Sequence, residues 1–155
     1  MVRYLLLIPA LAATLAAAGC GSGSKNDYVQ SVNKAEASLQ KSMSSLSGIG
    51  ASSSGAQVAT QLESGSNALD AAADDFNDIK PPDDAKHAHG KIVDGLHKLA
   101  GTFREAAKSA KAAKSPDDLQ ATAKVLSDIA TGEGAKELQE AQDELTANGY
   151  KFKSS

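Results

Sequence analysis

Apolar and small residues recur at alternating spacings of three and four along most of this chain, with polar residues between them. The clearest stripe comprises Val58, Leu62, Gly65, Leu69, Ala72, Phe76 and Ile79. These spacings place the residues on one face of an α-helix. Outside the first 19 residues, no run alternates with the two-residue period of a strand. The pattern therefore predicts an all-helical domain.

Four helices are predicted, over about 26–46, 54–80, 82–114 and 115–147. The first carries the stripe Tyr28, Val32, Ala35, Leu39, Met43 and Leu46. The stripe of the third is Ala85, His89, Ile92, Leu96, Leu99, Phe103, Ala106 and Ala110. The fourth has Leu119, Ala123, Leu126 and Ile129 or Ala130, followed by Leu138, Ala141 and Leu145.

Prolines and glycines mark the predicted helix ends. Pro81-Pro82 ends the second helix, because proline lacks an N–H and clashes with the preceding turn, and Pro82 suits the first position of the third. Ser115 is the predicted N-cap of the fourth. Each interior glycine costs ~1 kcal/mol relative to alanine, so we expect the fourth helix to weaken, kink or break near Gly132–Gly134.

These elements favour an all-α fold, an antiparallel four-helix bundle with up-down-up-down topology, since the connections are short. The bundle is expected over residues 26–149, with Asn148-Gly149 ending the last helix. Residues 150–155 are expected to form a frayed tail.

The first 19 residues have the layout of a secretory signal peptide. Arg3 supplies a positive charge, and Tyr4 to Ala18 contains no charged residue. Pro9 interrupts this apolar stretch, which is shorter than the about 20 residues of a bilayer-spanning helix. The segment therefore indicates export rather than a membrane span.

The run Ala17-Ala18-Gly19-Cys20 resembles the lipobox of bacterial lipoproteins, with Ala17 where that family prefers leucine. The resemblance implies cleavage before Cys20, a diacylglycerol on its thiol, and a flexible lipidated tether over residues 20–25. Two or more acyl chains hold a protein stably at a membrane. We therefore expect an extracytoplasmic protein anchored to the bacterial cell membrane, with acylation of the Cys20 amine left open. The alternative is an ordinary cleaved signal with a free thiol.

Composition narrows the classes of function. The chain has a formal net charge of −3 and no tryptophan, and an exported acidic protein is a poor candidate for nucleic-acid binding. Cys20 is the only cysteine, so no disulfide can form within one chain and stability must come from packing.

The three histidines, His87, His89 and His97, are the first candidates for a metal or haem site. His89 and His97 lie about 12 Å apart along a helix axis and cannot share an ion. In an up-down bundle, Met43 and His89 lie at opposite ends and cannot ligate one haem iron. We therefore expect His89 to be a structural core residue and His97 to lie on an outer face, with no metal or cofactor site.

Acidic and nucleophilic residues also lack a catalytic arrangement. Asp70, Asp74, Asp75, Asp78, Asp83 and Asp84 crowd one end of the second predicted hairpin. Their helical spacing does not supply the alternating ligands of a calcium loop, so a solvated acidic face is expected. The serines concentrate in linkers, where no base accompanies them. We predict that the protein is not an enzyme and has no catalytic residue.

A further face of the third helix combines Gly90, Asp94, His97 and Gly101. Small residues there would let a partner backbone approach, although glycine is also tolerated on an exposed face.

The run Ile79-Lys80-Pro81-Pro82, followed by His89, Ile92, Val93 and Leu96, resembles small lipoproteins of high-GC Gram-positive bacteria. This resemblance implies a helical, lipid-anchored domain and no particular activity. We therefore predict a non-enzymatic binding or scaffolding module at the cell surface, whose protein partner the sequence does not specify. The alternatives are a small-ligand carrier with a cavity between helices and, less favoured, a metal- or haem-binding bundle.

Overall fold

The computed structural model describes residues 24–44, 54–115 and 131–152, together with Asp118, Thr122, Lys124 and Val125. The four main helices are α1 (Lys25–Ser44), α2 (Gly55–Asn77), α3 (Lys86–Ala112) and α5 (Glu133–Ala147), and the 3-10 turn η2 (Asp83–Ala85) precedes α3. No strand occurs within these ranges. The predicted signal peptide, Cys20 and most of the predicted tether lie outside the described residues.

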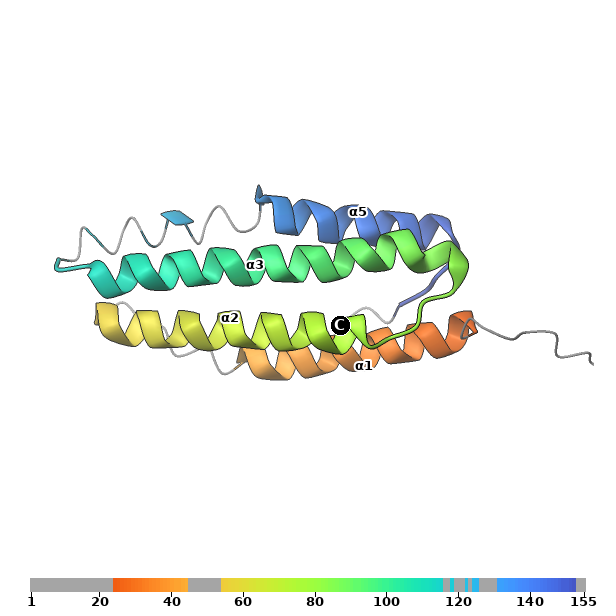
Figure 1. The fold of residues 1–155 in the computed structure, drawn as a ribbon, viewed down its shortest axis with the longest axis horizontal. Helices are drawn as coiled ribbons and strands as arrows, with labels where there is room; N and C mark the ends of the chain where they lie inside the picture. The colour runs from red at the N-terminus through yellow and green to blue at the C-terminus, as the bar shows by residue number, and fades with distance from the viewer. Residues whose placement is uncertain are drawn as a thin grey trace, which may run out of the picture.

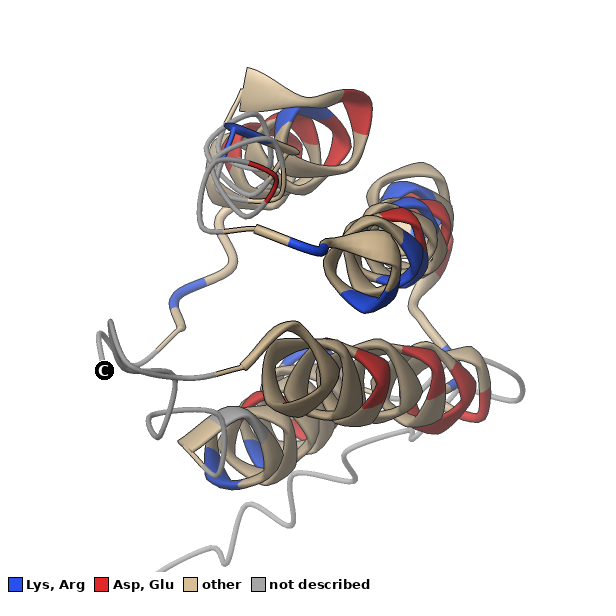
Figure 2. Ribbon diagram, turned by 90° about the vertical axis from the view of Figure 1, so that its left-hand side faces the viewer, with Lys and Arg blue, Asp and Glu red and all other residues tan. Residues whose placement is uncertain are grey.

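Over these ranges the structure is an all-α four-helix bundle with the predicted up-down-up-down topology. In Figure 1, α1 and α3 run in one direction, and α2 and α5 run in the other. The end-on view in Figure 2 places α5, α3, α2 and α1 along an arc rather than at the corners of a closed square. The principal helix contacts follow this order, α1 with α2, α2 with α3, and α3 with α5.

The helix boundaries follow local chemistry. The Ser54 hydroxyl accepts a hydrogen bond from the backbone N–H of Gln57 at 3.3 Å, and the Gln57 side chain accepts one from the Ser54 N–H at 2.8 Å. This reciprocal pair is a capping box. The second helix ends at Asn77 rather than near Lys80, because Pro81 disfavours helical geometry in the residue before it.

The start of the third helix also differs from the prediction. Pro82 caps η2, and α3 begins only at Lys86. The predicted cap at Ser115 is present: its hydroxyl accepts from the Asp118 N–H at 3.3 Å, and the Asp118 carboxylate accepts from the Ser115 N–H at 3.0 Å. Most of residues 116–130, including the stripe from Leu119 to Ala130, lies outside the described residues.

The core has two parts. The larger cluster joins all four helices and includes Tyr28, Leu69, Phe76, Leu96 and Leu145. The smaller cluster lies between α2 and α3 and consists of Val58, Ala59, Leu62, Ala106, Ala107 and Ala110. The half-buried Phe103 packs against both. The predicted stripes of α2 and α3 therefore face the interior.

Helices α3 and α5 approach each other at two glycines. A Cβ atom added at Gly95 would lie 2.9 Å from the carbonyl oxygen of Gly134, and one added at Gly134 would lie 2.7 Å from the carbonyl oxygen of Gly95. Gly134 is the second residue of α5, and Gly132 is its N-cap. The expected interruption near Gly132–Gly134 is thus the start of α5.

Ion pairs flank this contact in an antiparallel register. Lys91 Nζ lies 2.7 Å from a Glu140 carboxylate oxygen, and Lys98 Nζ lies 2.5 Å from one of Glu137. These groups are partly exposed, and surface pairs contribute only about 0–1 kcal/mol each. The glycine contact therefore sets the helix spacing, and the ion pairs select its register.

The expectation of a frayed tail is wrong for Tyr150, which is buried, and for Phe152, which packs against the core. The reason is a Schellman motif: the N–H of Gly149 bonds to the Thr146 carbonyl, and the N–H of Tyr150 bonds to the Leu145 carbonyl. Gly149 adopts a φ of 84°, the left-handed conformation that glycine favours at this position. This turn directs the chain back across the bundle toward α1.

A polar cluster at Asp84 joins three elements at this end of the bundle. The Tyr150 hydroxyl donates to the Asp84 carboxylate at 2.6 Å, and Lys25 Nζ lies 2.6 Å from its other oxygen. Lys25 also donates to the Asn148 carbonyl, and Asn148 donates to the Asp84 carbonyl. The cluster therefore connects the start of α1, η2 and the end of α5.

Candidate functional site

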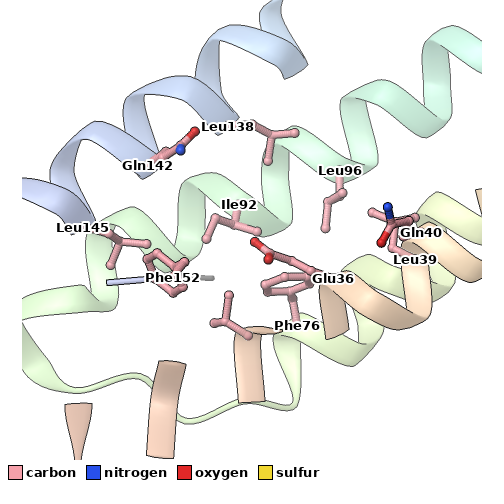
Figure 3. A pocket seen from close by; sticks show the side chains of 11 residues that line it. Glu36, Leu39, Gln40, Phe76, Ile92, Leu96, Leu138, Gln142, Leu145 and Phe152 are labelled. Carbon is pink, nitrogen blue, oxygen red and sulfur yellow. The ribbon is translucent and has the colours of Figure 1, made fainter. Parts of the chain in front are cut away.

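A cavity of about 600 Å³ lies between α1 and α5. Side chains from all four helices and from the C-terminal segment line it (Figure 3). The lining residues are Val32, Glu36, Leu39, Gln40, Phe76, Ile92, Leu96, Leu138, Gln142, Leu145 and Phe152. We call this cavity the α1–α5 cleft.

The cleft exists because the helices form an arc. Helix α1 packs on α2, and α5 packs on α3, so the two outer helices stand at opposite ends of the arc (Figure 2), and the cavity lies between them. Phe152 occupies one part of this space, because the Schellman turn returns the chain toward α1. Half-buried Leu39, Ile92 and Leu138 contribute the apolar walls. Its volume falls within the range of small-molecule sites, about 300–1,000 Å³.

Among the described residues that line the cleft, Glu36 alone is ionisable. The residue is exposed as a whole, but Figure 3 shows its carboxyl group reaching from α1 into the cleft, close to Phe76 and Ile92. Burial raises the pKa of this carboxyl group, because apolar surroundings disfavour its charged form. Among the described residues, none donates a hydrogen bond to this carboxylate or forms an ion pair with it.

Two amides add polar groups to the cleft. Gln40 lies one helical turn after Glu36 on α1, and Gln142 lies on α5 at the opposite side of the cavity (Figure 3). Both residues are exposed. The site therefore combines apolar walls with a central carboxyl group and amides at its edges, a composition that suits an amphiphilic small molecule.

His89 is a structural core residue, as predicted from the sequence. Its residue exposure is 7%, and its Nδ1 lies 3.2 Å from the Tyr28 hydroxyl. Burial raises the pKa of Tyr28 to about 12, so this hydroxyl remains protonated and can donate to a neutral imidazole. Burial lowers the pKa of His89, with a smaller opposing effect from the Phe76 backbone. The neutral ring is therefore favoured in the folded protein.

The other two histidines each contact a carboxylate on another helix. His87 Nδ1 lies 2.8 Å from Glu144, and His97 Nδ1 lies 3.3 Å from Asp70. Asp70 also accepts two hydrogen bonds from Arg104, at 3.1 and 2.9 Å. His97 is half-exposed, as expected for an outer face, but it contacts α2.

The acidic residues are dispersed among different partners. Asp70 pairs with Arg104 and His97, Asp84 with Lys25, and Asp83 with Lys86. Within the described ranges, no group of three or more histidine, cysteine, aspartate or glutamate side chains is arranged to hold a metal ion. The side chain of Met43, the other residue considered for haem, lies outside the described part of the structure.

The predicted partner face of α3 remains open at its glycines. A Cβ atom added at Gly90 or Gly101 would meet no atom within 4 Å. The close helix approach occurs instead at Gly95, which was not among the residues predicted for such a contact.

Cys20, the predicted lipidation site, lies outside the described residues. No described helix has an 18-residue window apolar enough to cross a membrane.

The sequence indicated an inter-helix cavity only as an alternative, and Glu36 was not among the predicted site residues. One signal was present: Glu36 follows Val32 by one helical turn and immediately follows Ala35, so it borders the apolar stripe of α1. A carboxylate at such a border usually turns toward water. Only the separation of α1 from α5 makes it part of a cavity.

Fold and site together define an all-α bundle that is open along the seam between its first and last helices. No protein-family model, curated protein or solved structure matches this chain.

Proposed function

We propose that this protein is a lipid-anchored, extracytoplasmic binding module that holds a small apolar molecule in the α1–α5 cleft. The observation that carries this proposal is the cleft of about 600 Å³ with mostly apolar walls. The sequence predicted a binding or scaffolding module, with a small-ligand carrier as the alternative, and the cleft favours the carrier. A scaffold needs an outer surface, whereas a cavity of this size leaves apolar side chains without packing partners unless a ligand fills it.

The proposed location, outside the cytoplasm and anchored to the membrane, is supported by the sequence rather than by the cleft. The lipobox resemblance at Ala17–Cys20 implies acylation, and the short run from Cys20 to Lys25 would then join the lipid to α1. In this arrangement the cleft lies outside the cytoplasm and near the membrane surface. Apolar molecules partition into membranes, so a carrier placed there would meet its ligand at a raised local concentration.

A fluorescence titration tests ligand binding directly. The chain contains no tryptophan, so a single introduced tryptophan is an unambiguous reporter. Gln40→Trp places it at the edge of the cleft, and Ala37→Trp places it at an exposed position of the same helix. Both variants are made in the predicted mature chain, residues 20–155, carrying Cys20→Ala, so that neither an attached acyl group nor the apolar signal segment competes for the cleft.

Decanol is the neutral apolar ligand in this titration. We expect a saturable change of Gln40→Trp emission with a stoichiometry near one, and no comparable change in Ala37→Trp. Equal responses of the two variants, or no saturable response while circular dichroism reports intact helices, would contradict the proposal.

A further inference from the structure

We propose that the ligand of the α1–α5 cleft is a cationic amphiphile, with a protonated amine that pairs with Glu36 and an apolar body that lies along the cleft walls. This inference rests on the proposed function and specifies the chemical class of its ligand. Its structural basis is the Glu36 carboxylate, which reaches into the cleft and has no cationic partner among the described residues.

Glu36 differs from the acidic residues that stabilise the bundle. Asp84, Glu137 and Glu140 each lie within 3 Å of a lysine nitrogen. Asp70 has Arg104 as its partner. Over the described ranges, Glu36 has no cationic neighbour of this kind, although it reaches into an apolar cavity. A carboxylate in such surroundings gains most from a charged hydrogen-bond donor.

The surroundings of Glu36 also select against other ligands. An anionic head group would meet a like charge and no basic residue among those that line the cleft. A neutral hydroxyl could donate to the carboxylate but would leave its charge uncompensated. A protonated amine supplies both a donor and the opposite charge, and the nearby Phe76 ring adds a surface that attracts cations.

The apolar walls explain why the cation should carry a hydrocarbon body. Val32 and Gln40 mark the extent of the cleft along α1, about 12 Å at ~1.5 Å per residue. Glu36 lies midway between them. Leu39, Ile92 and Leu138 extend the apolar surface around its carboxyl group. A small hydrophilic cation would leave these walls without contacts, whereas an alkyl or aryl amine covers them.

Three ligands with one hydrocarbon chain separate the charge preference from simple apolar binding. Decylamine, decanol and decanoate are titrated into Gln40→Trp at concentrations below micelle formation and at physiological salt. We expect decylamine to bind about tenfold or more tightly than decanol, because a charge-assisted hydrogen bond adds to the apolar contact. Decanoate is expected to bind more weakly than decanol.

Glu36→Gln then tests the assignment to this residue. Its amide has nearly the shape of the carboxyl group but carries no charge, so the preference for decylamine should disappear while decanol binding remains. The control Glu63→Gln changes an exposed carboxylate of α2 and should preserve the preference. This control separates pairing at Glu36 from general attraction to an acidic protein.

Each outcome bears on one proposal or on both. Equal affinities for the three ligands, or an amine preference that survives Glu36→Gln, would overturn the cationic-amphiphile inference and leave apolar binding in place. No binding of any of the three would contradict both the inference and the proposed function.

Discussion

Gly95 of α3 and Gly134 of α5 face each other so closely that neither position has room for a methyl group. The nearest atom to a Cβ at either site would be the other residue's carbonyl oxygen, at 2.9 Å for Gly95 and 2.7 Å for Gly134. Because these are backbone atoms, a rotamer change cannot relieve the clash. We expect Gly95→Ala to lower the free energy of unfolding by about 1–3 kcal/mol, as overpacking does elsewhere.

Gly90 and Gly101 provide the matched controls in the same helix. A Cβ atom at either would meet nothing within 4 Å. Since alanine favours a helix interior over glycine, each Gly→Ala change there should stabilise by about 0.5–1 kcal/mol. Urea titrations give the free energy of unfolding of all three variants. If Gly95→Ala and Gly90→Ala changed the free energy of unfolding in the same direction, the close-contact explanation would be refuted.

Because His89 is buried, we expect the protein to become less stable on acidification. Burial lowers the pKa of His89 in the folded state, so the unfolded chain binds the proton first as pH falls below its ordinary value near 6.5. The free energy of unfolding should therefore decrease from about pH 6.5 downward until the folded-state pKa is passed. His89→Gln should largely preserve the fold, should not change metal content and should reduce this dependence.

His97→Gln is the comparison for that experiment, because His97 is half-exposed beside Asp70. In denaturant titrations between pH 7 and 5, the free energy of unfolding of this variant should fall with pH as it does in the wild type. Stoichiometric zinc or haem in the purified protein, lost only in His89→Gln, would overturn the structural role.

Truncations of core residues should have large effects. Leu96 is 3% exposed in the main cluster and Leu62 is 2% exposed in the smaller one. Their replacement by alanine should destabilise by about 2–5 kcal/mol each, with Phe103→Ala toward the lower value because that ring is half-buried. Polar changes at exposed Asp94 or Lys98 should cost less than about 1 kcal/mol. Thermal melts giving equal, small effects at all five positions would contradict this core.

The Asp84 cluster makes an electrostatic prediction. The hydrogen bond from Lys25 and, second, that from Tyr150 hold the pKa of Asp84 below its ordinary value. Ionised Asp84 therefore stabilises the folded protein above the unfolded-state pKa, about 3.9. This stabilisation is lost as the pH falls through the lower folded-state pKa. Lys25→Met and Tyr150→Phe should each raise the Asp84 pKa in an NMR titration.

Asp83→Asn is the control, because Asp83 pairs with Lys86 outside this cluster. It should change the Asp84 pKa less than either of the two other variants does. An Asp84 pKa that is unaffected by both Lys25→Met and Tyr150→Phe would show that these contacts do not persist in solution.

The anchor prediction depends on Cys20, the only thiol in the chain. Cys20→Ala should abolish metabolic labelling with a fatty acid and leave an unprocessed or mislocalised precursor. Labelling and detergent partitioning that persist in Cys20→Ala would refute the lipoprotein assignment.

The described helices and their faces could be predicted because periodicity and capping are local. Ser54, the Pro81-Pro82 pair and Gly149 act within a few residues, so their effects could be read from the sequence to within about a turn. The stripe from Val58 to Phe76 is buried as expected. Fold class follows from these local signals and short connections.

Features that depend on the spacing between helices could not be predicted. Ala59, Ser66 and Ala73 lie beside the α2 stripe and are buried, because small residues let α2 and α3 approach closely. Gly95 is one glycine among several until Gly134 is placed opposite it. The role of Glu36 likewise depends on the separation of α1 from α5, a distance that no local pattern encodes.

The arc of helices also has a kinetic consequence. Helix α1 has one neighbouring helix as its main support, and the Asp84 cluster holds only its first residue, Lys25. Its far end, around Leu39 and Gln40, borders the α1–α5 cleft. Transient detachment of that end would open the cleft at a free-energy cost well below that of global unfolding. We therefore expect the residence time of a bound molecule to follow the opening rate of α1, so that ligand can exchange while α2, α3 and α5 stay packed.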